Sequence, residues 1–215
     1  MRKIYQKAII MLSVACMGYA TPAFAADAIV KTNKAWLSGA THIYGRMTVS
    51  GITSSNIKEK GFCYSSVNQM PTVEDGTSKI YLSNQGEIYN ISQLKPATVY
   101  YIRAYVKKTN GDVVYGDPVK AITRPKGGVT YNINDGFPSD ALTRVLSAAK
   151  EAIDLWNEYT GIHGLHITIN YGAQTQTADC SYGGWMRIGP NASYQKTGTL
   201  LHEMLHAIGV GTHGT

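Results

Sequence analysis

The spacing of hydrophobic positions changes once along the chain. From about residue 28 to residue 123, short runs rich in Val, Ile, Tyr and Thr are separated by Gly, Asn, Asp and Pro, without a helical period. Such a pattern predicts an all-β domain. After residue 128 the apolar positions recur about every 3.6 residues, which is typical of helices. The chain is therefore expected to be multidomain, with an all-β sandwich at 28–124, a linker at 125–128 and an α+β domain at 129–215.

The clearest predicted strand covers residues 99–106, where Val, Ile and Tyr dominate. Asn110 and Gly111 follow it, and both residue types tolerate a positive φ, so we expect a two-residue hairpin turn there. Residues 113–115 should then pair back against the strand.

The second domain is predicted to begin with a long helix that has Ser139 as its N-cap and ends at Gly161. The side chains predicted to face the core are Leu142, Val145, Leu146, Ala149, Ala152, Ile153 and Trp156. Residues 165–170 and 184–189 alternate as strands do. Helices and strands together predict a mixed layer of α and β structure.

An export signal is predicted at 1–25. Basic residues precede a short apolar stretch, and residues 23–25 form an A-x-A cleavage pattern. Cleavage before Ala26 would release a secreted, extracellular chain without a transmembrane span. The alternative is a surface lipoprotein cut before Cys16, although Ser13 stands where such signals normally carry Leu.

Composition narrows the possible partners. The formal net charge is +6, but three of the 20 basic residues lie in the predicted leader, and without them the charge falls to +3. A balance so close to neutral removes the main argument for nucleic-acid binding. Export permits disulfides, yet Cys63 and Cys180 belong to different predicted domains, so we expect two buried free thiols.

The first domain resembles fibronectin type III domains. Residues 94–100 read L-K-P-A-T-V-Y, which is similar to the L-x-P-x-T-x-Y signature of that family. The segment G-F-C-Y-S at 61–65, followed by Pro71, is similar to versions in secreted bacterial proteins. The resemblance implies that Tyr100 is the corner tyrosine, with its hydroxyl bonded back to the nearby backbone. Such sandwiches serve as spacers, adhesins or binding modules, so a surface or glycan partner is a possible role of this domain.

The string G-T-L-L-H-E-M-L-H near the end of the chain carries the strongest chemical signal. On a helix, His202 and His206 lie one turn apart on the same face and can offer two imidazole nitrogens to one ion. Imidazole ligands favour Zn²⁺, and Glu203 can act as general base toward a zinc-activated water. A packed helical face is the alternative, but a polar trio among apolar neighbours requires a partner. His163 and His166 have no further residue at ligand spacing and are expected in surface or packing roles.

Gly209 follows His202 at the spacing of the pattern H-E-x-x-H-x-x-G-x-x-H. Residues 129–215 thus resemble the metzincin zinc peptidases, and the resemblance implies the N-terminal part of an α+β catalytic domain. No Met follows Met204, so the methionine turn of that family is missing and we expect a truncated domain. The resemblance also implies that residues 184–189 form the edge strand against which an extended peptide substrate lies.

The third ligand of the metzincin pattern would fall on Thr212, whereas the histidine of this chain is His213. A left-handed turn at Gly209, with the extra Gly211, would allow the chain to bring His213 to the ion. The alternative third ligand is a Glu on a later helix, as in thermolysin-like enzymes, which would lie beyond the sequence.

These residues predict a secreted zinc-dependent endopeptidase that hydrolyses peptide bonds in a peptide or protein substrate. His202, His206 and His213 are the predicted Zn²⁺ ligands, and Glu203 is the predicted catalytic base. The alternative is a non-enzymatic surface adhesin whose metalloprotease-like remnant is inactive. An amidase or a glycan-directed hydrolase with the same metal chemistry also stays open, because the ligands fix the nucleophile and not the substrate.

Overall fold

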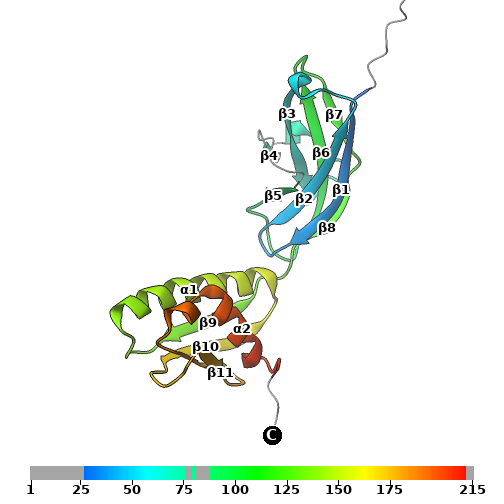
Figure 1. Cartoon of the computed structure of the whole chain (residues 1–215). Helices are drawn as coiled ribbons and strands as arrows, with labels where there is room; N and C mark the ends of the chain where they lie inside the picture. Colours follow the sequence, from blue (N-terminus) through cyan, green and yellow to red (C-terminus); the bar gives the residue numbers. More distant parts are fainter. Residues whose placement is uncertain (1–26, 76–78, 81–87, 212–215) are drawn as a thin grey trace, which may run out of the picture.

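The computed structural model describes residues 27–75, 79–80 and 88–211. The predicted leader at 1–25 and the predicted ligand His213 lie outside these residues. Two bodies follow one another along the chain, a β-sandwich and an α/β layer pair (Figure 1). None of the helices in the described part is long and apolar enough to cross a membrane.

The sandwich consists of two antiparallel sheets. The three-stranded sheet has the order β1-β2-β5, with β1 at Ile29–Ser38, β2 at Ile43–Ser50 and β5 at Ile88–Ile91. The other sheet has the order β4-β3-β6-β7, and β8 also pairs with β6. Its strands are β3 at Ile57–Ser65, β4 at Lys79–Ile80, β6 at Val99–Lys108, β7 at Val113–Tyr115 and β8 at Val119–Ile122.

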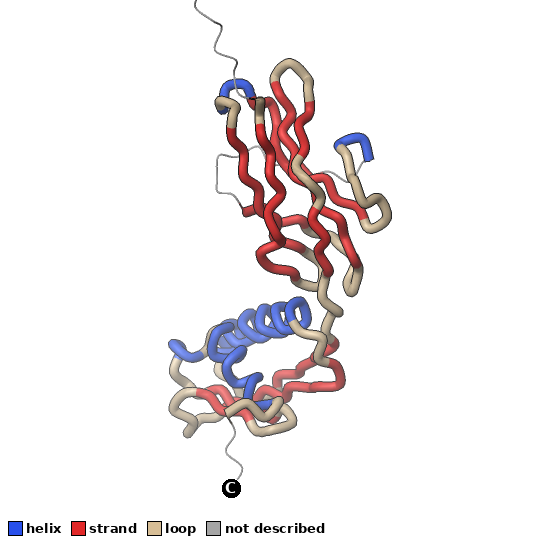
Figure 2. Tube along the Cα trace, turned by 90° about the vertical axis from the view of Figure 1, so that its right-hand side faces the viewer, coloured by secondary structure: helices blue, strands red, loops and turns tan. Residues whose placement is uncertain are grey.

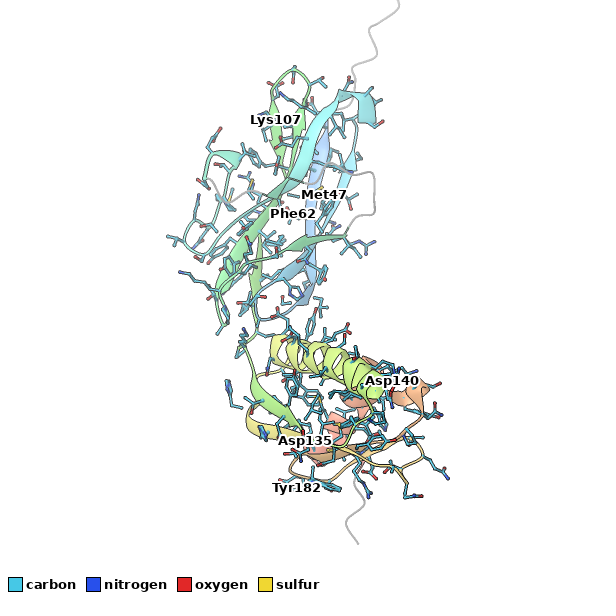
Figure 3. All side chains as sticks on the ribbon, turned by 90° about the vertical axis from the view of Figure 1, so that its left-hand side faces the viewer. Met47, Phe62, Lys107, Asp135, Asp140 and Tyr182 are labelled. Carbon is cyan, nitrogen blue, oxygen red and sulfur yellow. The ribbon has the colours of Figure 1, made fainter. Side chains whose placement is uncertain are left out.

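The core of the sandwich lies between the facing sides of the two sheets. Phe62 has no exposed surface and packs edge-on against Tyr89, while Met47 is 3% exposed. Figure 3 shows Met47 and Phe62 inside the domain. The Tyr100 hydroxyl accepts a hydrogen bond from the Lys95 backbone N–H at 2.9 Å, so the predicted tyrosine corner is confirmed. The strand order and this corner define a fibronectin type III-like sandwich.

The hairpin between β6 and β7 forms, but its turn differs from the prediction. Lys107 pairs with Val113, and the Lys108 N–H donates to the Asp112 carbonyl at 2.8 Å, which leaves three residues in the loop. Gly111 has φ +98°, whereas Asn110 is not among the residues with positive φ. A three-residue loop with a glycine at its left-handed position satisfies the same sequence, so the predicted two-residue turn is wrong.

The second body is one mixed sheet with both long helices on one face. Its sheet has the order β11-β12-β10-β9, in which only β11 is antiparallel to its neighbour. The elements are β9 at Gly128–Ile133, α1 at Ser139–Tyr159, β10 at His163–Tyr171, β11 at Ala178–Cys180, β12 at Trp185–Ile188 and α2 at Thr197–Ala207. Figure 2 shows the helices on the same side of these strands.

Alternation along the strands explains why the helices cover one face only. Ile167 and Ile169 of β10 are 1% exposed and Met186 and Ile188 of β12 are fully buried, and all four pack in one cluster with α1 and α2. The residues between them point to the opposite face.

Three details of the predicted second domain are corrected. Ser139 is the first residue of α1 rather than its cap, because Pro138 occupies the N-cap without a side-chain hydrogen bond. Leu146 is 47% exposed and does not belong to the buried face. Residues 184–189 do form a strand, β12, but it lies between β10 and β11, so the edge strand is β11.

Candidate metal centre

Helix α2 presents two different faces. Leu200, Met204 and Ala207 recur at helical spacing, are at most 2% exposed, and pack into the core with α1 and the sheet. Burial of these side chains fixes the rotation of the helix. His202 is consequently exposed and His206 is half-buried.

The two histidines form a compact pair on this helix. Their ring centroids are 5.0 Å apart and the rings stand at 88° to one another. His206 Nδ1 lies 2.7 Å from the Val210 carbonyl oxygen. Because a carbonyl oxygen only accepts, Nδ1 carries the proton, and the Nε2 of a neutral ring keeps its lone pair. A backbone partner of this kind orients a ligand histidine.

The chain after α2 turns back over His206. The Gly209 N–H donates to the His206 carbonyl at 2.9 Å and the Val210 N–H to the Leu205 carbonyl at 2.9 Å, which is the bond pattern of a Schellman motif. Gly209 has φ +90°, so the predicted left-handed turn is confirmed. At Gly211, with φ +71°, an added Cβ would lie 3.3 Å from His206 Cε1, so the chain there runs directly against the imidazole ring.

Glu203 is the charged residue of the candidate site. It is 6% exposed, and its carboxylate accepts no hydrogen bond from the described part of the chain. Burial raises the pKa of its carboxyl group, and the Asp179 carboxylate raises it further, while His202 and His206 oppose this shift. A carboxylate with this environment holds a proton more readily than an exposed one does.

A cleft of about 380 Å³ opens beside Glu203 and His202. The other residues that line it are Thr177, Tyr194, Lys196, Gly198 and Thr199. Thr177 directly precedes the edge strand β11, which packs against α2. The cleft therefore lies between the start of α2 and the edge strand β11 of the sheet.

The other predicted residues lie away from this cleft. His166 bonds Thr130 at 2.8 Å and Asn132 at 2.8 Å on the sheet face opposite the helices. This agrees with the surface role predicted for it. Trp185 and Arg187 alternate with the buried residues of β12 and lie on the same outer face, where the guanidinium group stands 5.3 Å from the indole ring.

The donor set fits zinc in part. Two imidazoles one turn apart and a neighbouring carboxylate have the chemistry of a zinc peptidase centre. No group of three or more His, Cys, Asp or Glu side chains that could hold a metal ion occurs within residues 27–75, 79–80 and 88–211. His213, the predicted third ligand, is two positions beyond the last of them.

Sequence reasoning missed the walls of the cleft. Strand β11 has only three residues, Ala178–Cys180, too few for an alternation pattern to be visible. Tyr194 and Lys196 lie in an irregular segment between β12 and α2 that contains only a single 3₁₀ turn at Ala192–Tyr194. Only their position just before the H-E-x-x-H helix could have indicated that they line the site.

No protein-family model matches the chain, and no curated protein does. Among solved structures, the chain is similar to the sixth fibronectin type III domain of human fibronectin type III domain containing protein 3, with 22% identity and a TM-score of 0.32 over 51% of this chain and 88% of that one. The chain is also similar to the fn3 domain of human contactin 1, with 17% identity and a TM-score of 0.34 over 54% of this chain and 96% of that one. The similarity to the sensor domain of the anti-sigma factor RsgI4 from Pseudobacteroides cellulosolvens has 16% identity and a TM-score of 0.32, over 45% of this chain and 94% of that one.

Similarities at this level carry no argument about function. The description of the first domain as fibronectin type III-like therefore depends on its own strand order and on the Tyr100 hydrogen bond.

Proposed function

We propose that the chain is an exported zinc-dependent endopeptidase whose site is built on α2. The observation that carries the proposal is the arrangement of His202, Glu203 and His206 beside a cleft, with the His206 ring oriented by the Val210 carbonyl. His202 and His206 would bind the metal through their ring nitrogens, and His213 is the candidate for the third position. Zinc bound there would polarise a substrate carbonyl and lower the pKa of a coordinated water.

The reach of the chain supports His213 as third ligand. Gly211 already lies against the His206 ring, and two residues span at most about 7 Å. A glycine with positive φ at each of two nearby positions, Gly209 and Gly211, curls the chain around the ring instead of leading it away. The extra residue relative to the metzincin spacing is compatible with this tighter path.

Glu203 would transfer protons within the cleft. Its carboxylate borders the cleft next to His202, where it can take a proton from the attacking water and return it to the leaving amine. The raised pKa that burial gives this group brings it closer to the range in which a general base and acid both operate.

The free edge of β11 would hold an extended peptide. Gly189 N–H donates to the Thr177 carbonyl and Ser181 N–H to the Trp185 carbonyl, so the backbone groups of Thr177 and Ser181 face β12. In an antiparallel pair the intervening residues, Ala178 and Cys180, direct their backbone groups away from the partner strand. A substrate added as a further strand would bond to these groups beside the cleft.

The test compares metal content and proteolysis in the parent and in three variants. Purified parent protein is expected to contain one zinc per chain and to cleave an unfolded protein substrate. Glu203→Gln should keep the zinc and lose the cleavage, whereas His202→Ala and His206→Ala should lose both. A parent that binds no stoichiometric zinc would refute the site. Zinc binding without cleavage in the parent would favour the adhesin with an inactive remnant.

A further inference from the structure

The fibronectin type III-like sandwich and the α/β body touch at a second place besides the linker. The turn between β1 and β2, residues 39–42, contacts the last turn of α1, which contains Glu158 and Tyr159. Figure 1 shows this end of α1 beneath the sandwich, and Figure 3 shows Asp140 at the other end of the helix, away from the linker. We call this contact, made by Gly39, Ala40, Thr41 and His42 with Glu158 and Tyr159, the interdomain joint.

Glu158 is the centre of the joint. Its Oε1 accepts hydrogen bonds from the Thr41 backbone N–H at 2.6 Å and from the Thr41 hydroxyl at 3.0 Å, and lies 2.7 Å from His42 Nδ1. Its backbone carbonyl accepts from the Ala40 N–H at 2.8 Å. The side chains of His42 and Glu158 are only 13% and 15% exposed, so these charge-assisted bonds are largely shielded from water.

The His42 ring has a hydrogen-bonding partner at each of its two nitrogens. Its Nδ1 faces the Glu158 carboxylate, and its Nε2 lies 2.8 Å from the Tyr159 hydroxyl. The rings of Tyr44 and Tyr159 pack edge-on against it at centroid distances of 5.0 and 5.4 Å. Gly39 completes the fit, because a Cβ at this position would clash with Glu158 Oε1.

The linker between the two domains allows little change in its backbone conformation. Arg124 is tied to the sandwich, since its N–H donates to the Gly39 carbonyl and its Nε to the Ser38 carbonyl. On the other side the Gly127 N–H donates to the Asn157 carbonyl at 2.8 Å. Only Pro125 and Lys126 lie between these anchors, and the proline ring fixes one of the backbone dihedrals.

From these two connections we infer that the sandwich and the α/β body form one rigid unit, locked by the Glu158 carboxylate. A single short linker would still allow rotation, and small interdomain contacts normally permit it. A second attachment, away from the linker and built from partly buried charge-assisted bonds, removes that rotation. The sandwich is then a fixed platform that holds anything bound to it at a constant orientation to the α2 cleft, rather than a flexible spacer. This inference is independent of zinc and of peptidase activity.

The test measures domain orientation by NMR residual dipolar couplings in weakly aligned, ¹⁵N-labelled protein. In the parent, the amides of both domains should fit a single alignment tensor. Glu158→Ala should lose this common tensor while each domain still fits a tensor of its own. Asp154→Ala, one turn earlier on α1 with a side chain that is 62% exposed, is the matched control and should behave as the parent does.

A second variant, on the other side of the joint, shows whether the result for Glu158→Ala comes from the loss of the joint or from a local change in α1. Gly39→Ala adds one methyl group that displaces the Glu158 carboxylate from the turn, and it should give the same loss of a common tensor. Two separate tensors in the parent would overturn the inference. So would a single common tensor in both Glu158→Ala and Gly39→Ala, because the joint would then not hold the domains together.

Discussion

Two glycines at opposite ends of α2 give opposite predictions when each is replaced by alanine. Gly209 has φ +90°, and a Cβ there would meet only the Tyr182 ring at 3.7 Å, an ordinary contact. The cost of Gly209→Ala is therefore backbone strain, about 1–2 kcal/mol. Gly198 is the second residue of α2, and no atom lies within 4 Å of an added Cβ there. Gly198→Ala is expected to stabilise the domain by about 0.5–1 kcal/mol, because alanine loses less backbone entropy on folding.

Urea titration followed through the NMR signal of the Trp156 indole N–H measures both effects. Trp156 is 6% exposed in the core between α1 and the sheet, so its signal reports the folded α/β body. Gly209→Ala should unfold at lower urea than the parent and Gly198→Ala at higher urea. An unchanged midpoint for Gly209→Ala would refute the argument that the left-handed conformation ends the helix.

The same pair of variants tests the link between the helix end and the proposed metal site. The turn at Gly209 holds the Val210 carbonyl 2.7 Å from His206 Nδ1. Disturbing such a partner of a ligand lowers metal affinity by about 10- to 100-fold. Zinc competition with a chelator should show this loss for Gly209→Ala and parent-like affinity for Gly198→Ala. A destabilised Gly209→Ala that binds zinc as tightly as the parent would show that the turn does not orient the ligand.

Two further predictions concern stability and thiol chemistry. Tyr100→Phe leaves the Lys95 N–H without its 2.9 Å partner and should lower the unfolding free energy of the sandwich by about 1–3 kcal/mol, measured by urea titration of NMR signals from that domain. Burial raises the pKa of the Cys63 and Cys180 thiols from 9.0 to about 12. This lowers the thiolate fraction near neutral pH by about a thousandfold, so a disulfide reagent should label both thiols far more slowly in native than in urea-unfolded protein.

Local patterns predicted the elements that bury one side. The alternation at 99–106 predicted β6, and the alternation at 165–170 predicted β10, because in each strand every second residue packs into a core. The same signal did not fix the turn after β6. The pair Asn110-Gly111 suits both a two-residue loop and the observed three-residue loop, and the choice depends on the pairing of Lys107 with Val113.

Features that depend on contacts between residues far apart in the sequence could not be predicted from local patterns. The position of β12 inside the sheet follows from its pairing with β10 and β11, and periodicity says nothing about neighbours. The interdomain joint has the same origin, since Glu158 and Thr41 are 117 residues apart and neither belongs to a recognisable motif. Leu146 matches the helical period and yet is exposed, because α2 and the sheet cover only part of α1.

The candidate site divides along the same boundary between local and distant determinants. His202, Glu203 and His206 are placed relative to one another by the helical repeat alone, so the sequence sufficed to bring them together. The third ligand depends on the path of the chain after the helix, which periodicity cannot give. The Schellman turn fixes the first part of this path. It holds the Val210 carbonyl oxygen 2.7 Å from His206 Nδ1 and places Gly211 against the same ring. The helix end orients the His206 ring through Nδ1, which leaves the lone pair of Nε2 for a metal ion. We propose His213 for the third ligand because it follows Gly211 by two residues.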